Sequence, residues 1–224
     1  MSQYELVVFD WDGTLMDSTG GIVRAIQAAS RDMGFDVPDD RNAAWVIGLS
    51  LDEALAHLAP KMTDRDRDRY LERYRYHYLT KDAELRLFDG VRPMLDALSE
   101  EGVMLAVATG KSRVGLERAL QATGLGHYFA VTRCADETHG KPNPRMLLEI
   151  MADLATEPEA AVMIGDTTHD LGMAANAGIH GLGVSYGAHP ESDLRAHPHQ
   201  DIVSSVTEMH DWLKPRTRGV RSTK

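Results

Sequence analysis

Two carboxylates, Asp10 and Asp12, stand directly behind an apolar run near the start of the chain. In an extended chain, residues i and i+2 point to the same side, so both side chains can face one small volume. At about 4 Å, two such charges repel by roughly 4 kcal/mol if the effective dielectric is about 20. A cation, a shared proton or open water must relieve this repulsion. Such a pair also occurs in solvated turns, so its meaning depends on the other segments of the chain.

The elements that must position these carboxylates alternate between short apolar runs and helical patterns. The runs that predict strands are residues 6–9, 103–108, 129–132, 161–164 and 182–184. This alternation predicts an α/β fold, in which a parallel sheet is covered by helices on both faces. In open sheets of this kind, ligands bind beyond the carboxyl ends of the strands. Reactive residues are therefore expected directly after the apolar runs.

Three further loops in such positions carry polar residues. Thr109 and Gly110 offer a hydroxyl and a backbone N–H where a helix begins, a place that favours anions. Lys141 is the single lysine of the loop after the third run, which two prolines stiffen. Asp166 and Asp170 are four residues apart, a spacing that can place both on one side of an entering helix. Each loop alone is a weak signal, and their shared place at strand ends makes the set strong.

Together, these loops contain what a phosphoryl-transfer site needs. The carboxylates suit Mg²⁺, which takes few protein ligands and shares its other positions with water and a phosphoryl group. A lysine and a hydroxyl suit phosphate oxygens, and phosphoryl transfer depends mainly on alignment and charge neutralisation. The set therefore fits a Mg²⁺ site that acts on a phosphate group.

The same motifs resemble those of the haloacid dehalogenase-like hydrolase superfamily, in its phosphoglycolate phosphatase-like branch with a helical cap of the C1 type. The resemblance spans about residues 5–186, and the motifs are Asp10-Trp11-Asp12-Gly13-Thr14, Thr109-Gly110, Lys141, and Gly165-Asp166 through Asp170. It implies a Rossmann-like core, a mobile cap and Mg²⁺-dependent hydrolysis of a phosphate ester. The partner it implies is a small phosphorylated metabolite, with phosphoglycolate as the first substrate to consider.

The resemblance also implies chemical roles for three of the motif residues. Asp10 would be the nucleophile that forms an aspartyl-phosphate. Asp12 would protonate the leaving oxygen and later activate water, while its backbone carbonyl helps to hold Mg²⁺. Lys141 would neutralise the nucleophile and the transferring group.

The other motif residues would bind the phosphoryl group and the metal. Thr109 and the Gly110 N–H would grip the phosphoryl oxygens, and Asp166 would ligate Mg²⁺. Asp170 is expected to orient the site from behind, with a simple role at a helix start as the alternative. Lys111 adds positive charge near the phosphate in one interpretation and lies on a helix surface in the other.

One long stretch interrupts the alternation, because it shows helical periodicity without a convincing strand. A helix is expected after Ser18 and can end at Gly34, and Ser50-Leu51-Asp52-Glu53 fits a capping box at the start of another helix. The predicted division is a Rossmann-like core at 1–16 and 89–213, an inserted α-helical cap at 17–88, and a basic, flexible tail at 214–224.

Composition limits the classes of protein to which the chain can belong. Its 224 residues are 43% hydrophobic and 26% charged, as in ordinary globular proteins. The net charge of -10 argues against a nucleic-acid partner, and no run approaches the roughly 18 apolar residues of a membrane span. No secretory signal is visible, and the single cysteine, Cys134, cannot form an internal disulfide. We therefore expect a cytoplasmic protein without nucleic-acid or membrane partners.

Two other functions stay open on the sequence alone. Sugar phosphomutases of the β-phosphoglucomutase type are similar, but their fourth motif usually carries adjacent glutamate and aspartate, whereas here Thr167 follows Asp166. A catalytically silent regulator that binds Mg²⁺ or phosphate would share most of the same residues. Histidines are not expected to take part, because His169 is predicted to lie at the surface or to pack, and His189 to lie in a solvated loop.

Overall fold

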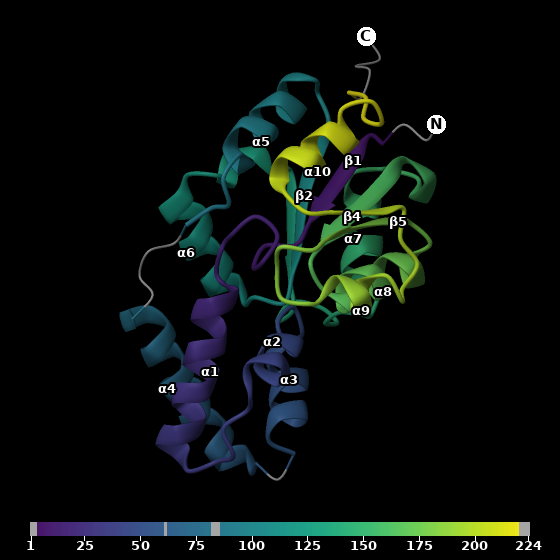
Figure 1. Ribbon diagram of the computed structural model, residues 1–224. Coiled ribbons are helices and arrows are strands. Elements are labelled where there is room, and N and C mark those ends of the chain that lie inside the picture. The colour runs from purple at the N-terminus through teal and green to yellow at the C-terminus, as the bar shows by residue number, and fades with distance from the viewer. Residues whose placement is uncertain (1–3, 61, 82–85, 220–224) are drawn as a thin grey trace.

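The computed structural model describes residues 4–60, 62–81 and 86–219, which form an α/β fold around a parallel sheet (Figure 1). The sheet has six strands in the order β3-β2-β1-β4-β5-β6, and each neighbouring pair is parallel. The strands are β1 (Leu6–Phe9), β2 (Met104–Thr109), β3 (Val131–Cys134), β4 (Ala161–Gly165), β5 (His180–Val184) and β6 (Asp201–Val203). This is a doubly wound, Rossmann-like order, in which ligands bind where the order reverses, here beside β1 and β4.

The central strands are buried on both faces because alternate side chains enter two separate cores. In β1, Val7 and Phe9 belong to one core, and Leu6 and Val8 belong to the other. Successive side chains of a strand point to opposite faces, so a strand covered on both sides needs a continuous apolar run. The first core contains side chains of α5 (Val91–Glu100), α6 (Arg113–Thr123) and α10 (Val206–Leu213), and the second contains side chains of α7 (Arg145–Asp153) and α8 (Thr168–Ala177).

Helices α1 to α4, which we call the helical insert, lie between β1 and α5 in the sequence and gather beyond the carboxyl ends of the strands (Figure 1). They are α1 (Thr19–Met33), α2 (Asp40–Trp45), α3 (Leu51–Leu58) and α4 (Asp64–Lys81). Helix α1 ends at Gly34, which takes a left-handed φ of 70°. Helix α3 begins with the expected capping box of Ser50 and Glu53. Polar residues directly after the strands therefore face this insert.

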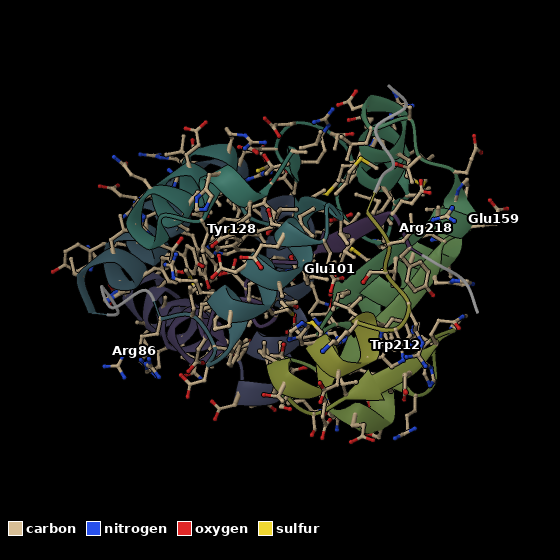
Figure 2. All side chains as sticks on the ribbon, turned by 90° about the horizontal axis from the view of Figure 1, so that it is seen from above. Arg86, Glu101, Tyr128, Glu159, Trp212 and Arg218 are labelled. Carbon is tan, nitrogen blue, oxygen red and sulfur yellow. The ribbon has the colours of Figure 1, made fainter. Side chains whose placement is uncertain are left out.

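The two ends of the described chain meet at the opposite end of the sheet. The Tyr4 N–H donates to the Arg216 carbonyl at 2.6 Å, and the Arg218 N–H donates to the Tyr4 carbonyl at 2.9 Å. The Arg216 guanidinium lies 4.5 Å from the ring centre of Trp212. Figure 2 shows Trp212 and Arg218 on the same side of the molecule. The first part of the predicted tail thus contacts the core, and residues 220–224 lie outside the described residues.

The α/β class predicted from the sequence is confirmed, and the five predicted strands are present with bounds that differ by up to two residues. Strand β6 was not predicted, because it is a three-residue edge strand that begins with Asp201 and lacks an apolar run. Two short 3-10 helices, Gly126–Tyr128 and Pro158–Ala160, and the four-residue helix α9 (Glu191–Leu194) complete the described elements. No helix among the described residues is both long and apolar enough to cross a membrane.

Candidate active site

The carboxyl ends of the strands bring Asp10, Lys141 and Asp170 into contact. Asp10 follows β1, Lys141 lies in the loop after β3, and Asp170 stands in the first turn of α8. The Lys141 Nζ is 2.7 Å from Asp10 Oδ1 and 2.6 Å from Asp170 Oδ1. At most 1% of the surface of any of the three residues is exposed. One buried ammonium therefore joins two buried carboxylates.

Burial and neighbouring charges shift the pKa values within this group. Burial is the main reason why the pKa of Asp10 rises to about 7; Lys141 lowers that pKa, and the carboxylates of Asp170 and Asp12 raise it. Burial alone would lower the pKa of Lys141, but Asp10 and Asp170 outweigh burial and hold that pKa above its ordinary value. Lys141 is therefore a permanent cation, and Asp10 depends on positive charge nearby to stay ionised.

Asp166 occupies a tight niche beside this group. Its Oδ1 accepts a hydrogen bond from Thr14 Oγ1 at 2.8 Å, and its Oδ2 accepts one from the Ala188 N–H at 2.7 Å. Two glycines make the room, because a side chain on Gly13 or Gly187 would collide with the Asp166 carboxylate. Gly13 also has a φ of 83°, which favours glycine. The turn after Asp12 is thus shaped around Asp166.

Three of the buried carboxylates form a group that could hold a metal ion. One oxygen each from Asp10, Asp166 and Asp170 lies within 4.8 Å of the others. Burial is the main cause that raises the pKa of Asp166 well above its ordinary value, and the other two carboxylates add to it. Oδ2 of Asp10 is buried and has no hydrogen-bond partner among the described residues. An all-oxygen group with an unpartnered oxygen fits a hard divalent cation such as Mg²⁺.

Asp170 uses its two carboxylate oxygens differently. Its Oδ2 accepts hydrogen bonds from the Thr167 N–H at 3.0 Å and from Thr167 Oγ1 at 2.6 Å, while its Oδ1 faces Lys141. The first pair of bonds belongs to a capping box at the start of α8. The helix-start role considered for Asp170 is therefore present together with its contact to the buried lysine.

Asp12 lies outside the group of three carboxylates, at the wall of a cavity. Its Oδ2 is 2.9 Å from Lys111 Nζ, and its Oδ1 accepts a hydrogen bond from Ser18 Oγ at 2.7 Å. The Lys111 ammonium also lies 5.2 Å from the ring centre of Tyr78 in α4. Only 12% of the Lys111 side chain is exposed, so the helix-surface interpretation of this residue is wrong. Lys111 instead connects the core to the helical insert beside Asp12.

The cavity has a volume of about 900 Å³ and lies between the core and the helical insert. Asp10, Asp12, Thr109 and Gly110 form part of its core wall, and the loop 47–50 forms part of the opposite wall. A side chain on Gly110 would collide with the Gly48 carbonyl and would lie 2.6 Å from the Leu49 carbonyl oxygen. The structure therefore brings the predicted phosphate-binding residues to the same space as the paired aspartates.

His169 and His189 are buried where the core meets the helical insert. Their Nε2 atoms lie 2.8 Å and 3.1 Å from the Trp45 carbonyl oxygen. His189 Nδ1 accepts a hydrogen bond from the Thr168 N–H at 3.0 Å, so its proton is on Nε2 and is donated to Trp45. Burial is the main cause that lowers the pKa of His169 to about 4. The prediction that His189 lies in a solvated loop is wrong.

Three contributions to this site were not predicted: the Ser18 hydroxyl, the Ala188 N–H and the space left by Gly187. Gly187 and Ala188 follow β5 closely, so the expectation that polar contacts form just after strands would have found them if it had been applied to the fifth run. Ser18 follows Asp12 by six residues, and no local pattern indicates that their side chains meet.

The chain is similar to proteins that are named as phosphatases. A family model described as haloacid dehalogenase-like hydrolase matches residues 7–184. The chain is 37% identical over 210 residues to the "Probable phosphatase IndB" of Dickeya dadantii (strain 3937), with 91% of both chains covered. It is 29% identical over 188 residues to the phosphoglycolate phosphatase of Agrobacterium fabrum (strain C58 / ATCC 33970), with 81% of both covered.

A solved structure shows the same fold. The crystal structure of a predicted phosphatase from Clostridium acetobutylicum matches with a TM-score of 0.83 and 27% sequence identity, covering 96% of this chain and 100% of that chain. Because the likeness extends over nearly the whole of both chains, it includes the helical insert as well as the sheet.

Proposed function

Because this chain belongs to the haloacid dehalogenase-like hydrolase family and is a phosphoric monoester hydrolase, we propose that it hydrolyses a small phosphate monoester with the aid of Mg²⁺, through a phosphoryl group carried on Asp10. The observation that carries the proposal is the carboxylate of Asp10, whose Oδ1 lies 2.7 Å from Lys141 Nζ while its buried Oδ2 has no hydrogen-bond partner in the described part of the chain. An ionised carboxylate with a free oxygen can attack an electrophile such as phosphorus. The nearby cation favours the ionised form of the carboxylate.

In the first step, Asp10 would attack phosphorus and the ester oxygen would leave. Asp12 lines the same cavity as Asp10, and it would donate a proton to the leaving oxygen. Lys141 would offset the charge that gathers on the phosphoryl oxygens, and Thr109 with the Gly110 N–H would hold those oxygens in line. In the second step, Asp12 would take a proton from the water that releases phosphate from Asp10.

The carboxylates of Asp10 and Asp166 and the backbone carbonyl of Asp12 are the groups proposed to hold Mg²⁺. The bound ion would supply charge stabilisation to the transferring phosphoryl group. Asp170 is proposed to orient the site, with support from the contact of its Oδ1 with Lys141 and the hydrogen bond that its Oδ2 accepts from Thr167. Phosphoglycolate, the substrate named for one relative, is the first metabolite to test, and the cytoplasm is the expected location.

The direct test is hydrolysis of p-nitrophenyl phosphate by the full chain, with Mg²⁺ and with EDTA. We expect turnover that requires the metal and that falls by a factor of about 10³ or more in Asp10→Asn, because the nucleophile is then lost. Asp211→Asn is a matched control, since Asp211 is an exposed residue of α10 that neither lines the cavity nor belongs to the group of three carboxylates. Wild-type protein that binds Mg²⁺ without metal-dependent turnover would be a silent binder, and the proposal would fail.

A second readout addresses the covalent step. Rapid quenching in acid followed by intact-mass measurement should find one added phosphoryl group on wild-type protein, and none on Asp10→Asn. Wild-type turnover without such an adduct under single-turnover conditions would contradict the role proposed for Asp10, even if the protein is a phosphatase.

A further inference from the structure

The cavity next to the proposed phosphoryl site is lined on the side of the helical insert mainly by apolar and aromatic residues. We infer that the leaving alcohol of the substrate has a bulky, apolar, ring-bearing body that is seated between α1, α3 and α4. This inference rests on the proposed function, because it concerns the part of the phosphate ester that lies beyond the scissile bond. It departs from phosphoglycolate, whose leaving group is small and charged.

The helical insert lines the cavity mainly with apolar and aromatic side chains. Contributions come from Ile22 and Ile26 of α1, from Leu55 of α3, and from Tyr74 and Tyr78 of α4. The rings of Tyr74 and Tyr78 are stacked, with centroids 5.9 Å apart and planes at 11°. These rings add apolar surface to the wall, and the Lys111 ammonium and the Arg118 guanidinium lie 5.2 Å and 5.8 Å from the ring centre of Tyr78. These walls therefore favour a ring-bearing group over a hydrated one.

Three large apolar side chains at the edge of the same cavity are left in water. Leu51, Leu79 and Val114 are 37%, 44% and 76% exposed, and all three line the cavity. Leu51 and Leu79 belong to the helical insert, whereas Val114 belongs to α6 of the core. Exposed apolar groups that gather around one opening mark a surface that binds apolar ligands. Exposed apolar side chains thus belong to the cavity lining, beside charged residues such as Arg75 and Arg118.

Several polar groups of the insert that line the cavity are already engaged with other groups of the insert. The Ser50 N–H and Oγ both donate to Glu53 Oε2, at 3.1 Å and 2.6 Å. The Asp52 carboxylate is paired with Arg67. At the far wall, the Tyr70 hydroxyl donates to the Ile26 carbonyl at 3.0 Å. A sugar ring would lose the hydration of its hydroxyls and gain few new partners on this wall, which disfavours a polar leaving group.

Charge and size also argue against glycolate. The cations that line the described cavity are Lys111, Arg75 and Arg118; Lys111 is paired with Asp12, and both arginines are exposed. A small carboxylate beside Asp12 would meet a lysine that is already neutralised. The volume of about 900 Å³ lies at the upper end of the roughly 300–1,000 Å³ typical of ligand sites. A two-carbon leaving group would leave most of this space to water.

The test compares esters that differ only in the body of the leaving alcohol. The values of kcat/KM are measured with Mg²⁺ for ethyl phosphate, 2-phenylethyl phosphate and 2-phosphoglycolate, all esters of primary alcohols. We expect 2-phenylethyl phosphate to exceed both others by about tenfold or more, since an apolar group in a matching pocket contributes on that scale. Equal or lower kcat/KM for 2-phenylethyl phosphate would overturn the inference and leave the proposed function intact. Absence of metal-dependent hydrolysis of all three would overturn the proposed function instead.

Two variants test whether the cavity wall causes the preference for 2-phenylethyl phosphate over ethyl phosphate. Ala54→Phe adds a ring to the cavity wall, and Tyr74→Ala removes one; both should lower the ratio of kcat/KM for 2-phenylethyl phosphate over ethyl phosphate by about fivefold or more. Tyr76→Ala is the matched control, because Tyr76 lies on α4, is 52% exposed and does not line the cavity, so the wild-type ratio should persist. A ratio that is unchanged in both cavity variants, with folding verified by circular dichroism, would overturn the placement between the helices.

Discussion

The Ser18 hydroxyl donates a hydrogen bond to Oδ1 of Asp12 at 2.7 Å, although Ser18 occupies the position before α1 where a serine ordinarily caps the helix. The helix receives no hydrogen bond from this side chain. The hydroxyl and the Lys111 ammonium instead hold the two oxygens of Asp12, one each. Ser18 thus orients Asp12, the residue proposed to act as acid and base, instead of capping the helix.

Replacing Ser18 by alanine should reduce activity more than stability. Without the hydroxyl, Asp12 keeps only its contact with Lys111, and its carboxylate is free to turn. We expect kcat/KM for ethyl phosphate, whose basic alkoxide leaving group needs a proton, to fall about tenfold, which corresponds to the roughly 1.5 kcal/mol of a hydrogen bond to a charged group. The free energy of unfolding should change by less than about 1 kcal/mol, because cavity water can take the place of the hydroxyl.

Ser205→Ala supplies the comparison. Ser205 caps α10, where its side chain accepts a hydrogen bond from the Glu208 N–H. Its loss should lower the free energy of unfolding by about 1 kcal/mol and leave kcat/KM unchanged. Urea denaturation measures the free energy of unfolding of both variants, and steady-state kinetics measure their kcat/KM. If Ser18→Ala lost stability as a cap mutant does and kept full activity, Ser18 would have no part in orienting Asp12.

The sequence was sufficient to predict the class of fold and the places of the reactive loops, because both depend on local patterns. Apolar runs such as Leu6–Phe9 identify strands that are buried on both faces, and polar residues directly after a run identify the binding edge. The order of the strands is not contained in such a pattern, and it is this order that brings Lys141 from the loop after β3 to Asp10 after β1.

The remaining contacts depend on packing between distant segments. His189 is buried because it bonds Thr168, 21 residues away, and Trp45, 144 residues away. Lys111 could equally have faced water, and the Tyr78 ring and the Asp12 carboxylate together decide its position. Local rules cannot supply such pairings, which explains why His189 was expected to lie in a solvated loop.

The raised pKa of Asp10 predicts how the stability of the metal-free protein depends on pH. Burial lifts this pKa from 3.8 to about 7, so the folded state binds a proton more tightly than the unfolded state does. The resulting stabilisation is complete below about pH 4 and is lost as the pH rises through about 7. In EDTA, Asp10→Asn should therefore gain about 1–3 kcal/mol of stability relative to wild type between about pH 5 and about pH 8.

Urea midpoints for wild type and Asp10→Asn at the two pH values measure this difference. Mg²⁺ should reduce the loss of wild-type stability between the two pH values, because a bound cation stabilises the ionised carboxylate. Asp211→Asn serves as the control, since Asp211 is exposed on α10 and does not belong to the buried group around Asp10. A difference between wild type and Asp10→Asn that stays constant with pH would contradict the assignment of a raised pKa to Asp10.

Gly110 tests whether the helical insert must approach the phosphoryl site closely. Alanine at this position keeps the backbone N–H proposed to bind phosphate, and Gly110 has no positive φ, so the substitution adds only a methyl group. That methyl would meet the carbonyl oxygens of Gly48 and Leu49, which are backbone atoms and cannot swing aside. The loop 47–49 must shift, and we expect kcat/KM to fall about 100-fold, because a displacement of about 1 Å can have an effect of this size.

Gly126→Ala is the matched control, because the nearest neighbour of the added methyl group would be 3.9 Å away, and this variant should retain wild-type kinetics. Full activity in Gly110→Ala would mean that turnover does not need this close approach.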